Sequence, residues 1–113
     1  MADVLGTFEQ AVLLALVKPT TVLGKEAYGR AVLKEVQLRF DREISAGAVY
    51  ATLDRLEQKG LISSEVRPGD DARAGLPRRY YSIKPPGIRA LNEAKAAVDR
   101  IWSGVRFPLK GAT

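Results

Sequence analysis

Hydrophobic residues recur at helical spacing in four segments of the chain, and the first segment begins at Thr7. Phe8, Val12 and Leu16 fall on one side of it. Pro19 ends the segment because proline cannot continue a helix. The pattern predicts a first helix that is mostly buried.

The second segment covers residues 26–40, EAYGRAVLKEVQLRF. Ala27, Val36 and Phe40 lie on one side of a helical projection, while Arg30 and Lys34 lie elsewhere. The segment therefore predicts a second, amphipathic helix.

A third helix is predicted between Ser45 and Gly60. Serine is a favourable N-cap because its hydroxyl accepts a hydrogen bond from a free backbone N–H, and glycine tolerates the positive φ of a C-cap. Val49, Leu53 and Leu56 recur at i, i+4 and i+7, so one face of this helix is expected in the core.

The residues after the third helix predict an antiparallel hairpin. SSEVR (63–67) alternates polar and apolar residues, and RRYYSIK (78–84) is rich in aromatic and β-branched ones. Between them PGDDARAGLP is a polar loop bounded by proline and glycine. Strand alternation places one of Tyr80 and Tyr81 in the core.

A final helix is predicted from about Ile88 to Val105, after Pro85-Pro86-Gly87 breaks the second strand. Its hydrophobic residues are spaced 3, 4, 3 and 4 apart, which is the seam of a heptad repeat, and Trp102 sits beside the seam. We expect the seam to pair with a second copy of the chain, because so small a domain leaves little core to cover it. The alternative is a helix folded back onto the first one, and both arrangements can hold at once. The seam consists of Leu91, Ala94, Val98, Ile101 and Val105.

The predicted order, three helices followed by two strands and a helix, is that of a winged helix-turn-helix. The expected fold class is α+β and mostly α, with three helices, a two-stranded wing and a C-terminal dimerisation helix. The winged-helix domain would cover residues 1–85, the dimerisation helix 86–106 and a flexible tail 107–113. In this fold the third helix enters the major groove of DNA, and the hairpin contacts the backbone or minor groove beside it.

The first turns of the third helix carry little side chain. With its hydrophobic face inward, Gly47 and Arg55 point outward, and Tyr50 and Thr52 lie on the flanks. Such a helix can approach DNA closely and leaves Tyr50, Thr52 and Arg55 to reach phosphates or base edges. The alternative is that the alanines and glycine pack against a neighbouring helix and that Arg55 is a solvated surface charge.

The predicted wing carries five positive charges within 18 residues. We expect Arg73, Arg78 and Arg79 to contact DNA in preference to the other two. The aspartates at 70–71 oppose this expectation, because acids at the tip repel phosphate unless they turn away or cap the loop. The five basic residues are Arg67, Arg73, Arg78, Arg79 and Lys84.

Composition excludes most catalytic designs. The chain has no Cys and no His, which removes disulfides, thiol nucleophiles, zinc fingers and imidazole acids or bases. The 13 Asp and Glu form no paired acidic motif, so we expect no enzyme, no metal and no cofactor. Lys and Arg number 18, and the net charge of +5 suits a polyanionic partner.

The N-terminus, MADVLGTFEQ, carries an acid where a signal peptide carries basic charge. The longest apolar run, AVLLALV, is too short to span a bilayer. We expect a cytoplasmic protein without a membrane partner.

Taken together, the motifs resemble the PadR family of bacterial transcriptional regulators. The matching stretches are LGTFEQAVLLALV, EAYGRAVLKEV, SAGAVYATLDRLEQKGLI and GLPRRYYSIKPPGIRAL, which cover nearly all of residues 5–91 in order. The most specific feature is VYATLDRLEQKGLI together with RRYYSIKPPG. Pro85-Pro86-Gly87 is a departure, since the family usually has threonine and glycine after the wing strand.

The resemblance implies a dimeric repressor that binds double-stranded DNA at an inverted-repeat operator through the third helix and the wing. It also implies a dimer interface built from the first and last helices, which adds Phe8 to the seam and Trp102. Tyr28 and Gly29 match the family's second-helix signature. The implied DNA-binding positions are Ser45, Gly47, Tyr50, Thr52, Arg55, Arg78 and Arg79.

Trp102 is also a candidate effector contact. As in multidrug-sensing relatives of the family it resembles, Trp102 and its two-fold mate would line a cavity for a small, flat aromatic effector. The alternative is packing alone, because the large apolar area of tryptophan stabilises an interface without any ligand.

A second function stays open at this point, in which the winged helix is a protein-protein interaction module without specific DNA binding. The third helix lacks a clear base-reading pair such as Asn or Gln with Arg, so this alternative stays open.

Overall fold

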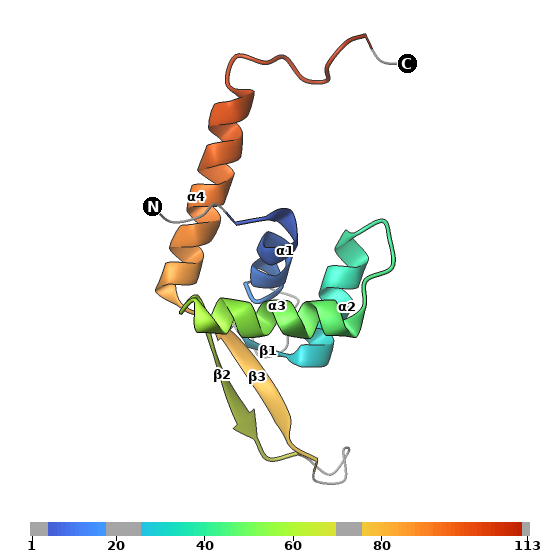
Figure 1. Cartoon of the computed structure of the whole chain (residues 1–113), viewed down its shortest axis with the longest axis vertical. Helices are drawn as coiled ribbons and strands as arrows, with labels where there is room; N and C mark the ends of the chain where they lie inside the picture. Colours follow the sequence, from blue (N-terminus) through green and yellow to red (C-terminus); the bar gives the residue numbers. More distant parts are fainter. Residues whose placement is uncertain (1–4, 18–25, 70–75, 112–113) are drawn as a thin grey trace.

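The computed structural model describes residues 5–17, 26–69 and 76–111 of the 113-residue chain. Three helices surround the core, a hairpin projects at one end of the molecule and a long final helix at the other (Figure 1). This is the predicted winged helix-turn-helix. In chain order the elements are α1 (Thr7–Ala15), β1 (Glu26–Tyr28), α2 (Gly29–Arg39), α3 (Ala46–Gln58), β2 (Ile62–Arg67), β3 (Arg78–Ile83) and α4 (Pro85–Trp102).

The wing hairpin continues into a three-stranded antiparallel sheet with the order β1-β3-β2. In its register, Ile62 is opposite Ile83 and Arg67 is opposite Arg78. On the other edge of β3, Tyr28 is opposite Tyr80. The hairpin is confirmed, but the sheet has one strand more than predicted.

The expected start of the second helix at residue 26 is wrong. Residues 26–28 form β1, and α2 begins at Gly29. The free edge of β3 offers backbone hydrogen bonds to this segment, and tyrosine suits a strand better than the first turn of a helix.

The core lies between α1, α2, α3 and the inner face of the sheet. Tyr81 is the tyrosine that faces it, with 4% of its surface exposed, and this burial raises the pKa of its hydroxyl. Val49, Leu53 and Leu56 are fully buried, which confirms the predicted inward face of α3. The other fully buried side chains of the core include Val12, Leu13, Leu16, Val32 and Val36.

Both predicted caps of α3 are confirmed. The Ser45 hydroxyl accepts a hydrogen bond of 3.1 Å from the backbone N–H of Ala48. At the other end, Gly60 has a φ of 77°, which only glycine adopts easily. The chain then turns directly into β2.

The predicted limits of the last helix need correction. It begins at Pro85 and not near Ile88, because proline fits the first helical positions, where no intrahelical N–H bond is required. It ends at Trp102, so Val105 lies beyond it, after Gly104 with a φ of 81°. None of the helices in the described ranges is long and apolar enough to cross a membrane.

An ion pair joins α1 to the end of α3. Lys59 Nζ donates to Glu9 Oε2 at 2.9 Å, and the backbone N–H of Gly6 donates to Glu9 Oε1 at 3.2 Å. Burial raises the pKa of Glu9, but these hydrogen bonds and the charge of Lys59 outweigh it, so the net pKa lies below the ordinary value.

Replacing Glu9 by Gln is expected to lower the free energy of unfolding by about 0.5–1 kcal/mol at neutral pH, because part of the pair is solvent-exposed. A depressed folded pKa stabilises the protein above the unfolded value of 4.5, so the difference should vanish as the pH falls below 4.5. Urea unfolding at pH 7 and pH 3 measures it. Glu93→Gln on α4 is the control, and an equal loss in that variant would contradict the assignment.

Candidate nucleic-acid interface

The first turn of α3 is exposed and nearly bare. Residues 46–48 are Ala, Gly and Ala, and a Cβ built on Gly47 would meet no atom within 4 Å. The turn therefore does not pack against a neighbouring helix. Its free N–H groups and its lack of side-chain bulk suit the close approach of a phosphate or a base edge.

Tyr50 lies beside the N-terminus of α2. A Cβ built on Gly29 would stand 2.9 Å from the Tyr50 hydroxyl and closer still to ring atom Cε1. Glycine at this position therefore makes room for the ring, which remains 36% exposed. The missing Cβ of Gly29 thus allows the Tyr50 hydroxyl to stand at the start of α2.

The expectation that Thr52 reaches outward is wrong. Its side chain is 1% exposed, and its Oγ1 accepts a hydrogen bond of 3.0 Å from Arg55 Nη2. Thr52 therefore orients Arg55 and does not itself present a free hydroxyl. A helical projection places Thr52 at the border of the buried face, and tertiary packing decides on which side of the border it falls.

Arg55 lies on the side of α3 away from Tyr50. It borders a groove of about 430 Å³ together with Arg42, Ser45 and Ala51. Because Arg55 also lowers the pKa of Glu9, its charge acts toward α1. Of the predicted DNA contacts on α3, Tyr50 and Arg55 thus lie on different flanks of the helix.

The wing arginines occupy opposite faces of β3. Arg79 shares the face of Tyr81, and its Nη1 donates to Ser64 Oγ at 3.0 Å. The Ser64 hydroxyl in turn donates to the Glu57 carboxylate of α3 at 2.9 Å. Through Ser64, the side chain of Arg79 is fixed to the third helix.

Arg78 lies on the outer face of the sheet with two tyrosines. Its guanidinium carbon is 4.2 Å from the ring centroid of Tyr28, and that of Arg67 is 4.5 Å from the ring centroid of Tyr80. The two rings meet edge to face at 6.0 Å. Cation-π stacking therefore holds both arginines against the sheet. Arg73, the third predicted wing contact, lies outside the described residues.

A cavity of about 310 Å³, which we call the wing recess, joins these groups. Gly29 and Arg30 border it from α2, Tyr50 from α3, and Arg78 and Arg79 from β3. The fold thus brings together three of the predicted DNA contacts. Arg30 was not among the DNA contacts predicted from the sequence, and Tyr28 was predicted only as a match to the family's second-helix signature. The one sequence signal for both residues is the stretch AYGR itself.

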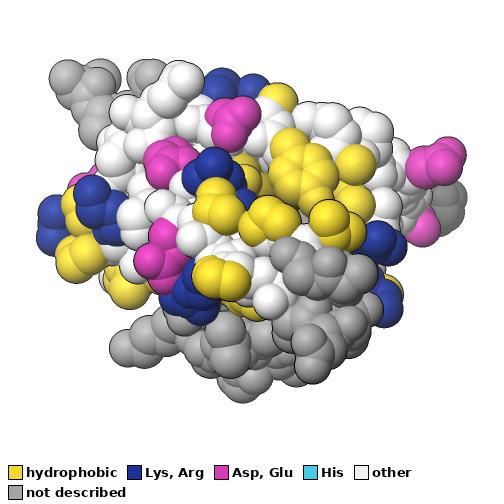
Figure 2. All heavy atoms as spheres, turned by 90° about the horizontal axis from the view of Figure 1, so that it is seen from below, with side chains coloured by type: hydrophobic (Ala, Val, Ile, Leu, Met, Phe, Trp, Pro, Cys, Tyr) yellow, Lys and Arg dark blue, Asp and Glu magenta, His cyan; other side chains and the backbone are white. Residues whose placement is uncertain are grey.

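Positive charge from the described residues at the wing end of the molecule is spread over separate places and does not form one continuous patch (Figure 2). Viewed from the wing end, Lys and Arg side chains stand at several separate places around a group of hydrophobic side chains (Figure 2). Within the described part of the chain, no group of three or more His, Cys, Asp or Glu is placed to hold a metal ion.

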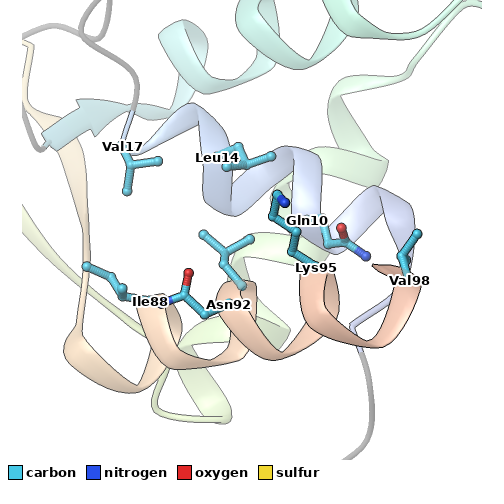
Figure 3. A pocket seen from close by; sticks show the side chains of 8 residues that line it. Gln10, Leu14, Val17, Ile88, Asn92, Lys95 and Val98 are labelled. Carbon is cyan, nitrogen blue, oxygen red and sulfur yellow. The ribbon is translucent and has the colours of Figure 1, made fainter. Parts of the chain in front are cut away.

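A second, apolar site lies between α1 and α4. This groove has a volume of about 580 Å³, and Leu14, Ile88 and Val98 point into it from the two helices (Figure 3). Val17, just beyond the end of α1, also lines it. These four side chains are 38–47% exposed in the single chain. We call this site the α1–α4 groove.

The predicted heptad seam divides into two parts. Ala94 faces the chain's own core and is only 1% exposed, so its expected place in a free seam is wrong. Leu91 is partly buried against this core and also lines the α1–α4 groove. Val98, Ile101 and Trp102 are exposed, and Figure 1 shows this half of α4 standing clear of the other elements. The first half of α4 thus folds back on α1, and the second half lacks a partner within the described chain.

Phe8 and Trp102 do not line the α1–α4 groove. Phe8 packs against the core, with its ring centroid 5.6 Å from that of Phe40. Its predicted contact with a second copy therefore gains no support from the groove. Trp102 meets Phe107 edge to face at 5.6 Å, near the end of α4.

The chain is similar to known proteins of one family. Residues 21–93 match the transcriptional regulator PadR-like family. The chain belongs to this family. It is a transcriptional regulator by family, and not an enzyme, as the sequence predicted.

Individual relatives agree with the family match. The transcriptional regulator Rv3488 of Mycobacterium tuberculosis is 37% identical over 76 residues, which are 67% of this chain and 66% of the relative. The crystal structure of a PadR family transcriptional regulator from Eggerthella lenta has a TM-score of 0.68 at 32% identity, covering 88% of this chain and 79% of that one. A PadR-like regulator from Bacillus cereus shares the fold, with a TM-score of 0.70 at 23% identity and 95% of both chains covered.

Proposed function

We propose that this PadR-like regulator is a dimeric repressor that binds double-stranded DNA at an inverted-repeat operator. The observation that carries the proposal is the convergence of Tyr50, Arg78 and Arg79 at the wing recess, beside the bare first turn of α3. Two elements, α3 and β3, thus present hydrogen-bond donors in one place, which is the arrangement that phosphate contacts need to fix the register of a protein on DNA.

In this proposal the predicted residues make different kinds of contact with DNA. The α3 N-terminus at Ser45 and Gly47 approaches a phosphate, Arg55 reads a base edge from the groove that it borders, and Arg79 contacts the backbone. Thr52 contributes by orienting Arg55 through its 3.0 Å hydrogen bond.

Dimerisation would use the α1–α4 groove and the free half of α4. A second copy is the natural occupant, because the exposed seam residues of one chain match the apolar lining of the other. A two-fold pair would present two α3 helices to major grooves about 34 Å apart.

The test is to recover the genomic fragments that the protein retains at moderate salt and to read whether they share an inverted repeat. A shared repeat supports the proposal. Retention of no fragment above background would instead favour a protein-protein interaction module.

Replacing Arg55 by Ala is expected to reduce the ratio of operator to random-sequence affinity about tenfold, because a base contact is lost. Replacing Arg79 by Ala is expected to weaken all sequences equally and to lower the salt slope by about one. Fluorescence anisotropy over a salt series measures both quantities. Arg89→Ala on α4 is the charge-matched control, and operator binding by both variants equal to the control would sink the assignment.

A small aromatic effector at Trp102 stays a prediction. Trp102 is 42% exposed, so its fluorescence would report a ligand that stacks on the ring. A spectrum that is indifferent to planar cations and phenolic acids, measured on the dimer, would count against it.

A further inference from the structure

The described lining of the wing recess carries positive charge alone, although burial and the nearby carboxylates of Asp54 and Glu57 together raise the pKa of Tyr81, which also lines it. Arg30, Arg78 and Arg79 all line it, and its described lining includes no carboxylate. Arg30 is exposed and makes no hydrogen bond or ion pair with the described residues. Like charges held this close repel one another, so an anion in the recess would relieve the repulsion.

The start of α2 adds directed donors to this charge. The helix begins at Gly29, and its N-cap Tyr28 makes no side-chain hydrogen bond to it. Tyr28 therefore supplies no capping acceptor to the first N–H groups of α2, and the helix dipole favours an anion there. Because Gly29 has no Cβ, the Tyr50 hydroxyl can stand at the same place.

Arg78 is oriented by an aromatic ring. Its Nε is buried and has no hydrogen-bond partner, while its guanidinium carbon lies 4.2 Å from the Tyr28 centroid. The guanidinium is thus held by stacking, and stacking leaves the donors at its edge available for an acceptor. Tyr28 is partly buried in the sheet, where it pairs with Tyr80, so the platform itself is fixed.

We infer that the wing recess holds one backbone phosphate of bound DNA, with Arg30 as an additional ligand and Tyr28 as the positioning residue for Arg78. The inference rests on the proposed DNA-binding function and specifies which group of the DNA enters the recess. A phosphate is the expected anion because guanidinium groups and helix N-terminal N–H groups both match its oxygens.

The source of the phosphate can be tested by neutralising the DNA one position at a time. Duplexes with a single methylphosphonate at successive positions are titrated with the parent protein, with Arg30→Gln and with Arg39→Gln. Arg39 lies at the other end of α2 and pairs with Glu35, which makes it the matched control. At one position we expect the parent and Arg39→Gln to lose affinity about three- to tenfold and Arg30→Gln to lose nothing further.

The positioning role of Tyr28 has its own readout. Tyr28→Phe keeps the ring and should bind DNA within about twofold of the parent, whereas Tyr28→Leu should bind about two- to fivefold more weakly. Adding Tyr28→Leu to Arg78→Gln should cause no further loss, because Tyr28 acts through Arg78. Circular dichroism verifies that each variant is folded.

The outcomes separate the inference from the function on which it rests. A parent protein that binds no DNA would overturn the proposed function. A parent that binds DNA, with no duplex position that depends on Arg30, would overturn the phosphate site alone. Additive losses in the Tyr28/Arg78 double variant would overturn the positioning role.

Discussion

Replacing Val98 by Glu is expected to separate the proposed dimer into folded monomers at micromolar concentration and to weaken operator binding at least about a hundredfold. Val98 lines the α1–α4 groove and is 46% exposed in the single chain, so a carboxylate costs little there until a second copy covers it. Burying an unpaired carboxylate costs several kcal/mol, and a two-fold interface contains the change twice. A loss of about 3 kcal/mol corresponds to the hundredfold effect.

Lys95 also lines the groove and could partly neutralise the new charge. Lys95 already pairs with Asp99 at 3.4 Å, however, so it does not offset the burial of the new carboxylate. Sedimentation and anisotropy titration measure the two effects. Ala96→Glu, which changes an exposed residue of α4 outside the groove lining, is the control. A Val98→Glu protein that remained dimeric would show that the second copy docks elsewhere.

The proposed dimer contacts and the wing lie at opposite ends of the molecule. Figure 1 shows the free half of α4 at one end and the wing at the other. The hydrogen-bonded series from Glu57 through Ser64 to Arg79 ties the wing to α3. The base of α4 follows β3 directly. A change at the dimer interface would therefore alter the spacing of two rigid DNA-binding units and not their internal geometry.

The parts that the sequence predicted correctly are those that local physics decides. Ser45 and Gly60 cap α3 because a hydroxyl and a missing Cβ each satisfy a requirement within a few residues. The alternation of RRYYSI likewise determined that one tyrosine is buried. These features need no knowledge of what the helix or strand packs against.

The parts that the sequence could not predict depend on packing between distant elements. Residues 26–28 pair with β3, which lies fifty residues further along the chain. Thr52 is buried by tertiary packing at the border of the α3 face, which a helical projection cannot show. The stack of Arg78 on Tyr28 requires the same unpredicted strand, so the recess was beyond sequence reasoning.

Gly87 is a position where we expect the addition of a single methyl group to cause a large loss of stability. It is buried at the start of α4, and a Cβ there would stand 2.8 Å from Ile83 Cγ1 and closer still to the Leu61 carbonyl oxygen. That carbonyl accepts the Lys84 N–H at 2.9 Å, so it cannot retreat without breaking the join between the wing and α4. Gly87→Ala is expected to lower the free energy of unfolding by about 1–3 kcal/mol.

The matched control is Gly47→Ala, the same substitution in the first turn of α3, where a Cβ meets nothing within 4 Å. There the methyl group is expected to leave stability unchanged or to raise it by up to about 1 kcal/mol, because alanine favours a helix over glycine. Urea denaturation of the two variants separates crowding from backbone entropy. Equal stability of the two would mean that the β3–α4 junction relaxes, and that the wing is held by the Glu57-Ser64-Arg79 series and not by its join to α4.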